Sequence, residues 1–192
     1  MIRTLLSLPD RAISWVEPMS TPVLTTLARF VFAAVLLMYF WNSGLTKIPD
    51  GVSGLFSPSF NAFAQIFPKG AEAAGYDITQ ASGFQKLVIL AGTWAEFILP
   101  ALVVLGLFTR AAAFGMIGFV VVQSLTDIFG HGGETGAWFD NLSDAAILDQ
   151  RAFWVFLLLY LVFKGGGPLS LDRLILRSET FPYQDDLRLS SR

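Results

Sequence analysis

The chain contains no cysteine, a single histidine and few charged residues, which make up 15% of its 192 residues. Without cysteine it forms no disulfide framework and no CxxC redox pair, and it offers no thiolate to an iron–sulfur cluster or to zinc. One histidine cannot supply the two axial imidazoles of a typical membrane cytochrome b haem. The net charge is −2, and no basic cluster is interleaved with aromatic residues. Nucleic acid is therefore not an expected partner.

Apolar residues account for 54% of the chain, and the mean hydropathy is +0.58. Since about 20 apolar residues of helix cross a bilayer core of roughly 30 Å, the long apolar runs predict membrane-spanning helices. Four are expected, at about residues 23–45, 86–108, 110–129 and 146–164. The predicted fold class is all-α: an integral membrane four-helix bundle whose main partner is the lipid bilayer, with short interfacial helices in the first outer loop and near the termini.

The fourth span needs a special assumption. Its uninterrupted apolar part covers only residues 152–163, which is short for a membrane crossing. Extending it back to residue 146 supplies the length, provided that Asp149 and Arg151 turn toward a headgroup layer. We adopt this extension as the prediction.

The remaining segments are predicted to lie on or beside the membrane. Residues 1–22 form an N-terminal interfacial segment, in which Ser7 before Pro9 is typical of a helix start, although a disordered lead-in fits equally. Residues 23–176 form the membrane domain, residues 177–192 a polar tail, and Ser170 is expected to cap a short amphipathic helix over 171–176.

The first long loop, residues 48–83, contains a helical pattern. Ser57 and Pro58 signal a helix start, and Pro68 with Gly70 signals its end. Four phenylalanines in between recur at the spacing of one helical face, which predicts a helix that either packs flat on the membrane surface or caps the bundle mouth: Phe56, Phe60, Phe63 and Phe67. The role of this loop and of the glycine-rich, acidic loop 130–150 stays open.

Basic residues near the span ends predict the orientation. Six lie on the side of the termini and four on the other: Arg3, Arg11, Arg110, Lys164, Arg173 and Arg177 against Lys47, Lys69, Lys86 and Arg151. By the positive-inside rule both termini are cytoplasmic. The chain is expected to be a multi-pass protein of the cytoplasmic (inner) membrane, and a homo-oligomer is compatible with the sequence.

One acid, Glu96, lies near the middle of the second span. A carboxylate there costs about 2.5–3.5 kcal/mol on insertion scales, so it is either protonated, paired or functional. Pro100, four residues later, leaves the carbonyl of Glu96 without its helical partner and is expected to bend the helix. Arg29 in the first span lies about 10 Å deep and Glu96 about 16 Å deep from the same edge, so a buried pair between them is predicted. Gln123 in the third span adds a polar group for contacts across the bundle.

Two further sets of residues are weighed as sites. Trp94 and Trp41, with neighbouring phenylalanines, could form a flat slot for a quinone ring, although such aromatics also serve in packing. His131 and Glu134 have an HxxE spacing that suits a divalent metal, but the glycines around them give no helix to align the ligands. No metal is therefore expected, and no cofactor is certain beyond the possible quinone.

Three short motifs resemble those of the DoxX family of small membrane proteins. The first ends span one, the second follows Glu96, and the third follows the fourth span: Gly44 and Lys47 in a GxxK pattern, Gly106 and Arg110 in a GLFTR segment, and Gly167, Ser170 and Asp172 in GGGPLSLD. In this order they cover about residues 25–176. The long loops 48–83 and 130–150 depart from the simpler members of the family.

This resemblance implies a four-helix bundle in the cytoplasmic membrane. Members are associated with membrane oxidoreductase systems, including a subunit of an archaeal thiosulfate to quinone oxidoreductase and a mycobacterial redox-defence complex. The resemblance thus favours a non-catalytic subunit or anchor of a quinone-linked system with a redox protein partner. The alternative is a small-molecule or proton permeation pathway that uses Glu96. No catalytic residue can be carried over, so Glu96 is only a candidate, and an activity of the chain alone is left uncertain.

Overall fold

A computed structural model describes residues 16–49 and 51–179, and within these ranges the chain is helical with no strand. Four helices are long and apolar enough to cross a membrane. The first joins α2 (Glu17–Phe32), η1 (Ala33–Leu37) and α3 (Met38–Thr46); the second is α6 (Gly83–Leu105); the third joins α7 (Thr109–Leu125) and η4 (Thr126–Gly130); the fourth joins η5 (Ala146–Gln150) and α8 (Arg151–Lys164). The predicted all-α, four-span membrane fold is confirmed.

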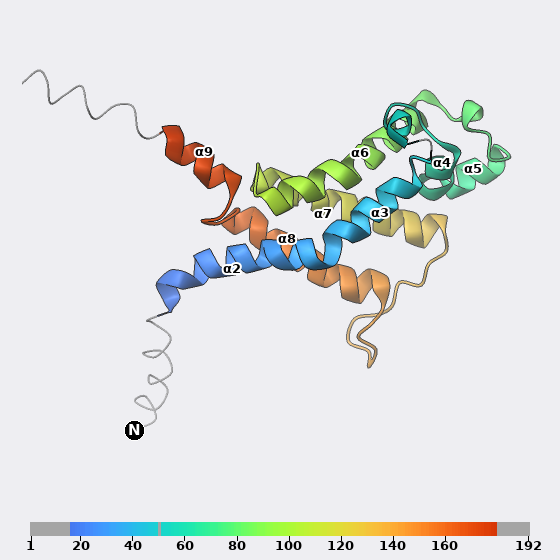
Figure 1. Cartoon of the computed structure of the whole chain (residues 1–192). Helices are drawn as coiled ribbons and strands as arrows, with labels where there is room; N and C mark the ends of the chain where they lie inside the picture. The colour runs from blue at the N-terminus through green and yellow to red at the C-terminus, as the bar shows by residue number, and fades with distance from the viewer. Residues whose placement is uncertain (1–15, 50, 180–192) are drawn as a thin grey trace, which may run out of the picture.

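The spans form an antiparallel bundle that Figure 1 shows from the side. The first span packs against α6 and α8, α6 against α7, and α7 against α8, so each helix has two neighbours. The three residues between Leu105 and Thr109 are too few for anything but antiparallel neighbours. Their shared core is made of buried apolar side chains from every span: Phe32, Leu36, Phe40, Val103, Ala112, Ala113, Met116, Val120, Leu158 and Leu161.

The first span begins earlier than predicted. α2 starts at Glu17, so residues 17–22 are continuous with the helix of the first span. Pro18 causes no strain there, because the first helical N–H groups have no partner within the helix. The helix start predicted at Ser7 and Pro9 lies outside the described residues.

The first loop folds into a helical cap at one end of the bundle, around α4 (Phe60–Ile66) and α5 (Pro68–Ala73), with η2 (Gly51–Leu55) and η3 (Ile78–Gln80) beside them (Figure 1). Ser59 caps α4 instead of Ser57, because its hydroxyl accepts from the N–H of Ala62 at 3.1 Å. Pro68 ends α4, as predicted, but it also opens α5.

The prediction that four phenylalanines share one helical face holds for two of them. Phe63 is buried in a second core that includes Ile89 of α6, and Phe67 packs on it. Phe56 and Phe60 are exposed and instead make edge contacts with Trp94 and Tyr76. Phe56 lies outside α4 because the chain is extended at Ser59, and Phe60 is the first residue of that helix.

The fourth span runs from Ala146 to Lys164, as predicted, but Arg151 does not face the headgroups. Its side chain is buried, forms an ion pair with Asp127 and donates to Ser124 Oγ at 3.0 Å. An acid on the neighbouring helix neutralises the guanidinium, and this lets it stay inside the bundle. Asp149 accepts from the N–H of Ala145.

At the opposite end from the cap, α9 (Leu171–Glu179) leaves the bundle at an angle (Figure 1). The hydroxyl of Ser170 accepts from the N–H of Arg173 at 3.3 Å. The predicted cap and short C-terminal helix are therefore confirmed.

Candidate functional site

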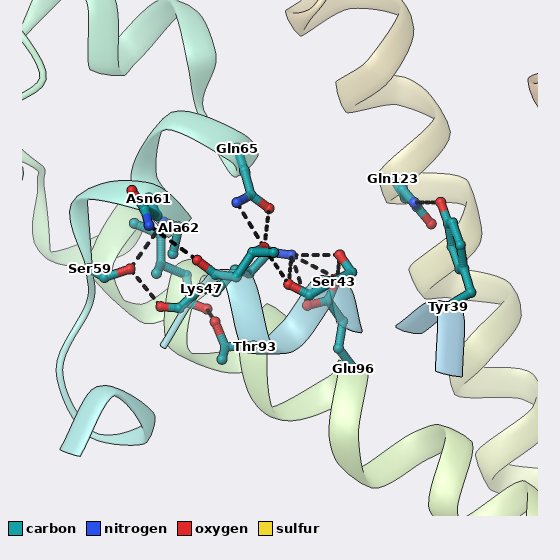
Figure 2. A network of polar contacts seen from close by, with 12 residues as sticks. Tyr39, Ser43, Lys47, Ser59, Asn61, Ala62, Gln65, Thr93, Glu96 and Gln123 are labelled. Carbon is teal, nitrogen blue, oxygen red and sulfur yellow. Dashed lines mark hydrogen bonds and ion pairs between the residues drawn. The ribbon is translucent and has the colours of Figure 1, made fainter. Parts of the chain in front are cut away.

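Glu96 is paired with Lys47. The Lys47 Nζ atom lies 2.9 Å from Glu96 Oε1 and 2.8 Å from Oε2, and the two residues are only 5% and 3% exposed. Ser43 completes the group, because its Oγ donates to Oε1 at 2.9 Å and lies 3.0 Å from Nζ (Figure 2). The buried ammonium and carboxylate thus share two hydrogen bonds, and Ser43 bonds to both groups, which lowers the cost of removing the two charges from water.

Helix geometry explains why these groups meet. Ser43 and Lys47 are four residues apart on α3, so they lie on the same face. Gly44 lies between them against α6, where an added Cβ would come within 2.7 Å of the Phe97 ring. The missing side chain lets α3 approach α6 closely enough for lysine to reach Glu96. Sequence reasoning marked Lys47 only as a motif position and missed Ser43, although the four-residue spacing was visible.

The predicted pair between Arg29 and Glu96 is wrong. Arg29 Nε donates to the carbonyl of Val103 at 3.1 Å, and Nη2 donates to that of Val104. Nη1 donates to the carbonyls of Gly166 and Leu169 at 3.1 and 3.0 Å. The last carbonyls of a helix lack partners within it and carry partial negative charge. The end of α6 therefore binds Arg29, and Glu96 is left to Lys47.

The third motif also binds at this end of α6. The Asp172 carboxylate accepts from the N–H groups of Phe108 and Thr109 at 2.7 and 2.9 Å, and from the Thr109 hydroxyl at 2.7 Å. Burial alone would raise the pKa of Asp172, but the bonds from Thr109 and Phe108 and the charge of Arg29 together hold it below its usual value. Asp172 is thus the cap of α7, supplied from a distant segment.

Two of the motif positions must be glycine because the segments that meet at this end of the bundle approach each other closely. A Cβ on Gly106 would lie 2.6 Å from Ser170 Cβ and 2.7 Å from Arg29 Cζ, and a Cβ on Gly167 would lie 2.0 Å from Thr25 Oγ1. Both have positive φ, +69° and +76°, where residues with side chains are disfavoured. These motif positions therefore build the bundle end, whereas Arg110 stays exposed there.

The Lys47–Glu96 pair lies in the wall of an interhelical cavity of about 460 Å³. The wall is mainly apolar, with side chains such as Val88, Leu99 and Phe119, and small residues of α6 and α7 leave the space: Ala91, Gly92, Ala95, Gly115 and Gly118. Binding sites for small organic molecules have this size and this apolar lining with few polar groups.

Gln123 supplies a further polar group in the same wall. Its Nε2 donates to the Tyr39 hydroxyl at 2.9 Å (Figure 2), whereas its Oε1 is buried without a hydrogen-bond partner among the described residues. A buried acceptor without a partner costs about 1–3 kcal/mol. Gln123 and Glu96 are therefore brought to one cavity, where a ligand that donates a hydrogen bond would be stabilised.

The two tryptophans do not line this cavity. The Trp41 indole donates to the carbonyl of Phe97 at 3.2 Å, and that of Trp94 donates to the carbonyl of Leu55 at 2.7 Å. Each ring thus links one segment to another. The slot predicted from Trp41 and Trp94 does not form in the cavity wall, and alanine and glycine supply the space instead.

His131 and Glu134 both line a second cavity of about 580 Å³ beside the third loop. The His131 Nε2 atom lies 2.9 Å from the carbonyl of Gln65, so this ring bonds to the cap. In the described part of the chain no three histidine or acidic residues group as metal ligands. His131 and Asp127 also line the first cavity, so the two cavities adjoin.

Comparison with known proteins gives one family match. The model of the DoxX family matches residues 24–132, which is more than half of the chain. The match includes Lys47 and Glu96 and stops before the third motif. No curated protein and no solved structure matches the chain.

Proposed function

Because the chain belongs to the DoxX family, we propose that it is a membrane subunit that binds a quinone, or a quinone-like amphipathic molecule, for a redox protein partner. The observation that carries the proposal is the mainly apolar cavity whose wall contains the Lys47–Glu96 pair and Gln123. The chain has no cysteine for a cluster and one histidine, so the electrons would be exchanged through the partner.

The chemistry of the wall fits a ring with two opposed polar groups. The ring and tail would lie against Val88, Leu99 and Phe119, and the hydroxyl of a reduced quinone would donate to Gln123 Oε1. The Lys47 N–H groups already donate to Glu96 and Ser43, so its positive charge, and not a further hydrogen bond, would stabilise a carbonyl of the oxidised form. Glu96 would hold Lys47 in place, which makes it a positioning residue in this proposal.

Two glycines allow a matched binding experiment. Gly118 lines the cavity, and Gly83 lies outside it at the start of α6; a Cβ on either meets no atom within 4 Å. Gly118→Leu should fill the cavity and abolish binding of a short-tailed benzoquinone to protein in nanodiscs, measured by calorimetry, whereas Gly83→Leu should bind as the wild type does. Equal binding by both variants, or no binding by the wild type, contradicts the proposal.

The redox partner is tested separately. The subunit hypothesis expects a protein that co-purifies in fixed stoichiometry in mild detergent, identified by mass spectrometry, and expects it with Gly118→Leu as well. A chain that purifies alone and yet binds quinone would retain the ligand site and remove the subunit role.

A proton pathway is the second candidate. The observation in its favour is that Asp127 and His131 line both cavities, which gives polar groups between the third loop and Glu96. Glu96→Gln should then abolish proton movement in liposomes reported by a pH-sensitive dye, and Asp172→Asn serves as a control remote from both cavities. Unchanged proton movement would eliminate this function.

For localisation we propose the cytoplasmic membrane with both termini cytoplasmic. The excess of six basic residues over four near the span ends supports this orientation. A reporter enzyme that is active only outside the cytoplasm, fused after residue 192, should be inactive.

A further inference from the structure

A third cavity, of about 730 Å³, lies at the α9 end of the bundle, away from the Lys47–Glu96 pair. It is enclosed by the link between α6 and α7, the end of α8, the glycine turn and the first turns of α9. The proposed function makes no use of it.

Three cations surround this cavity: Arg110, Lys164 and Arg173. All three are exposed, and none makes an ion pair with another side chain of residues 16–49 and 51–176. The acid in the wall, Asp172, already accepts three hydrogen bonds from Phe108 and Thr109. Its charge is therefore largely compensated, and the cavity carries an excess of positive charge.

The rest of the wall is mainly apolar and lies at the depth of a membrane surface. Thr109 begins the third span and Lys164 ends the fourth, so the cations lie where a bilayer core gives way to headgroups. Phe108 and Leu176, 68% and 65% exposed, extend apolar surface beside them. A soluble anion would use the charges and leave these side chains in water, whereas a lipid would cover both.

We propose that this cavity binds an anionic phospholipid of the surrounding bilayer. The phosphate lies among Arg110, Lys164 and Arg173, and an acyl chain follows Phe108 along the bundle. Basic pockets between membrane helices recognise anionic headgroups by this combination of charge and apolar surface. The lipid would thereby hold α9 against the ends of α7 and α8.

The test is lipid retention by the full chain. Protein in nanodiscs made of equal amounts of phosphatidylcholine and phosphatidylglycerol is extracted in mild detergent and weighed by native mass spectrometry. We expect the wild type to keep phosphatidylglycerol in preference to phosphatidylcholine. Each cation near an anionic lipid strengthens association about fivefold, so the double variant Arg110→Gln/Arg173→Gln should weaken retention about 25-fold.

Lys69→Gln is the matched control, because Lys69 is exposed on α5 at the other end of the bundle. It should retain phosphatidylglycerol as the wild type does. Since the altered side chains are exposed, an unchanged melting temperature in a lipid-free detergent shows that folding is intact. Equal retention of both lipids by the wild type, an unaffected double variant, or displacement by soluble glycerol phosphate would each overturn the proposal.

Discussion

Removing the Lys47 ammonium tests the central ion pair most directly. Lys47→Met keeps the length of the side chain and its apolar stem, but leaves Glu96, 3% exposed, with the Ser43 hydroxyl as its remaining partner. Breaking a buried pair by removing one partner destabilises a protein by about 3–5 kcal/mol, because the other charge stays buried and uncompensated. Lys47→Met should therefore be strongly destabilised.

A double variant gives a more specific prediction of the change in stability. Lys47→Met/Glu96→Gln removes both charges and keeps the shapes, and replacing a whole buried pair is often nearly neutral. It should be more stable than Lys47→Met alone. At about 2–4 °C per kcal/mol for a chain of this size, Lys47→Met should lower the melting temperature by roughly 6–20 °C, and the second substitution should restore most of the loss.

The measurement is a double-mutant cycle of thermal unfolding in one detergent at neutral pH, with Lys86→Met as the control because Lys86 donates only to the carbonyl of Thr79 near the surface. A coupling energy above about 1 kcal/mol supports the pair. Strictly additive losses would refute the reasoning, since they would mean that Lys47 and Glu96 do not stabilise each other.

Three further outcomes are expected at the α9 end and at the α3–α6 contact. Arg29→Met should destabilise the chain by about 3 kcal/mol or more, because it removes charged bonds to four carbonyls, and the loss should appear in a melting curve even when Glu96 is already Gln. Asp172→Asn should reduce the loss of stability at acid pH, measured by unfolding between pH 6 and pH 2. The sign follows from the lowered pKa of Asp172: its contribution is complete above the ordinary aspartate pKa, about 3.9, and is lost as the pH falls through the lower folded value. Gly44→Val should separate α3 from α6 and destabilise the chain as much as Lys47→Met does, whereas Gly118→Leu should leave the melting temperature near that of the wild type.

The spans could be predicted from the sequence because a bilayer imposes a length that composition reveals. Even the short fourth span was located correctly from Ala146 to Lys164. The orientation of the Arg151 side chain was predicted wrongly, because the prediction assumed that each charged side chain near the end of the span turns toward the nearest water. Asp127 lies near the end of the preceding antiparallel helix, and that placement was the available signal for an inward pair.

The partner of Glu96 was missed for a related reason. The predicted depths of Arg29 and Glu96 rested on the assumption that all spans begin at the same level. The helix α6 instead continues into the cap, where Ile89 packs with Phe63. The end of α3 therefore lies at the level of Glu96, below the mouth of the bundle. The cap is formed by the long loop 48–83, and the periodicity of its sequence could not predict how it packs on the bundle.

Arg29 in the first span and Lys47 at its end thus bind two different parts of α6, its carbonyl end and its middle. Arg29 binds the carbonyl end of α6 and closes it with the glycine turn and Asp172, without leaving a cavity at its own guanidinium. Lys47 binds Glu96 in the wall of a cavity that small residues keep open. A Cβ on Gly118 would meet no atom within 4 Å, so this glycine leaves space in the wall that helix packing does not require. The unpaired Gln123 oxygen in that wall supports the same conclusion, because packing alone would favour an apolar side chain there.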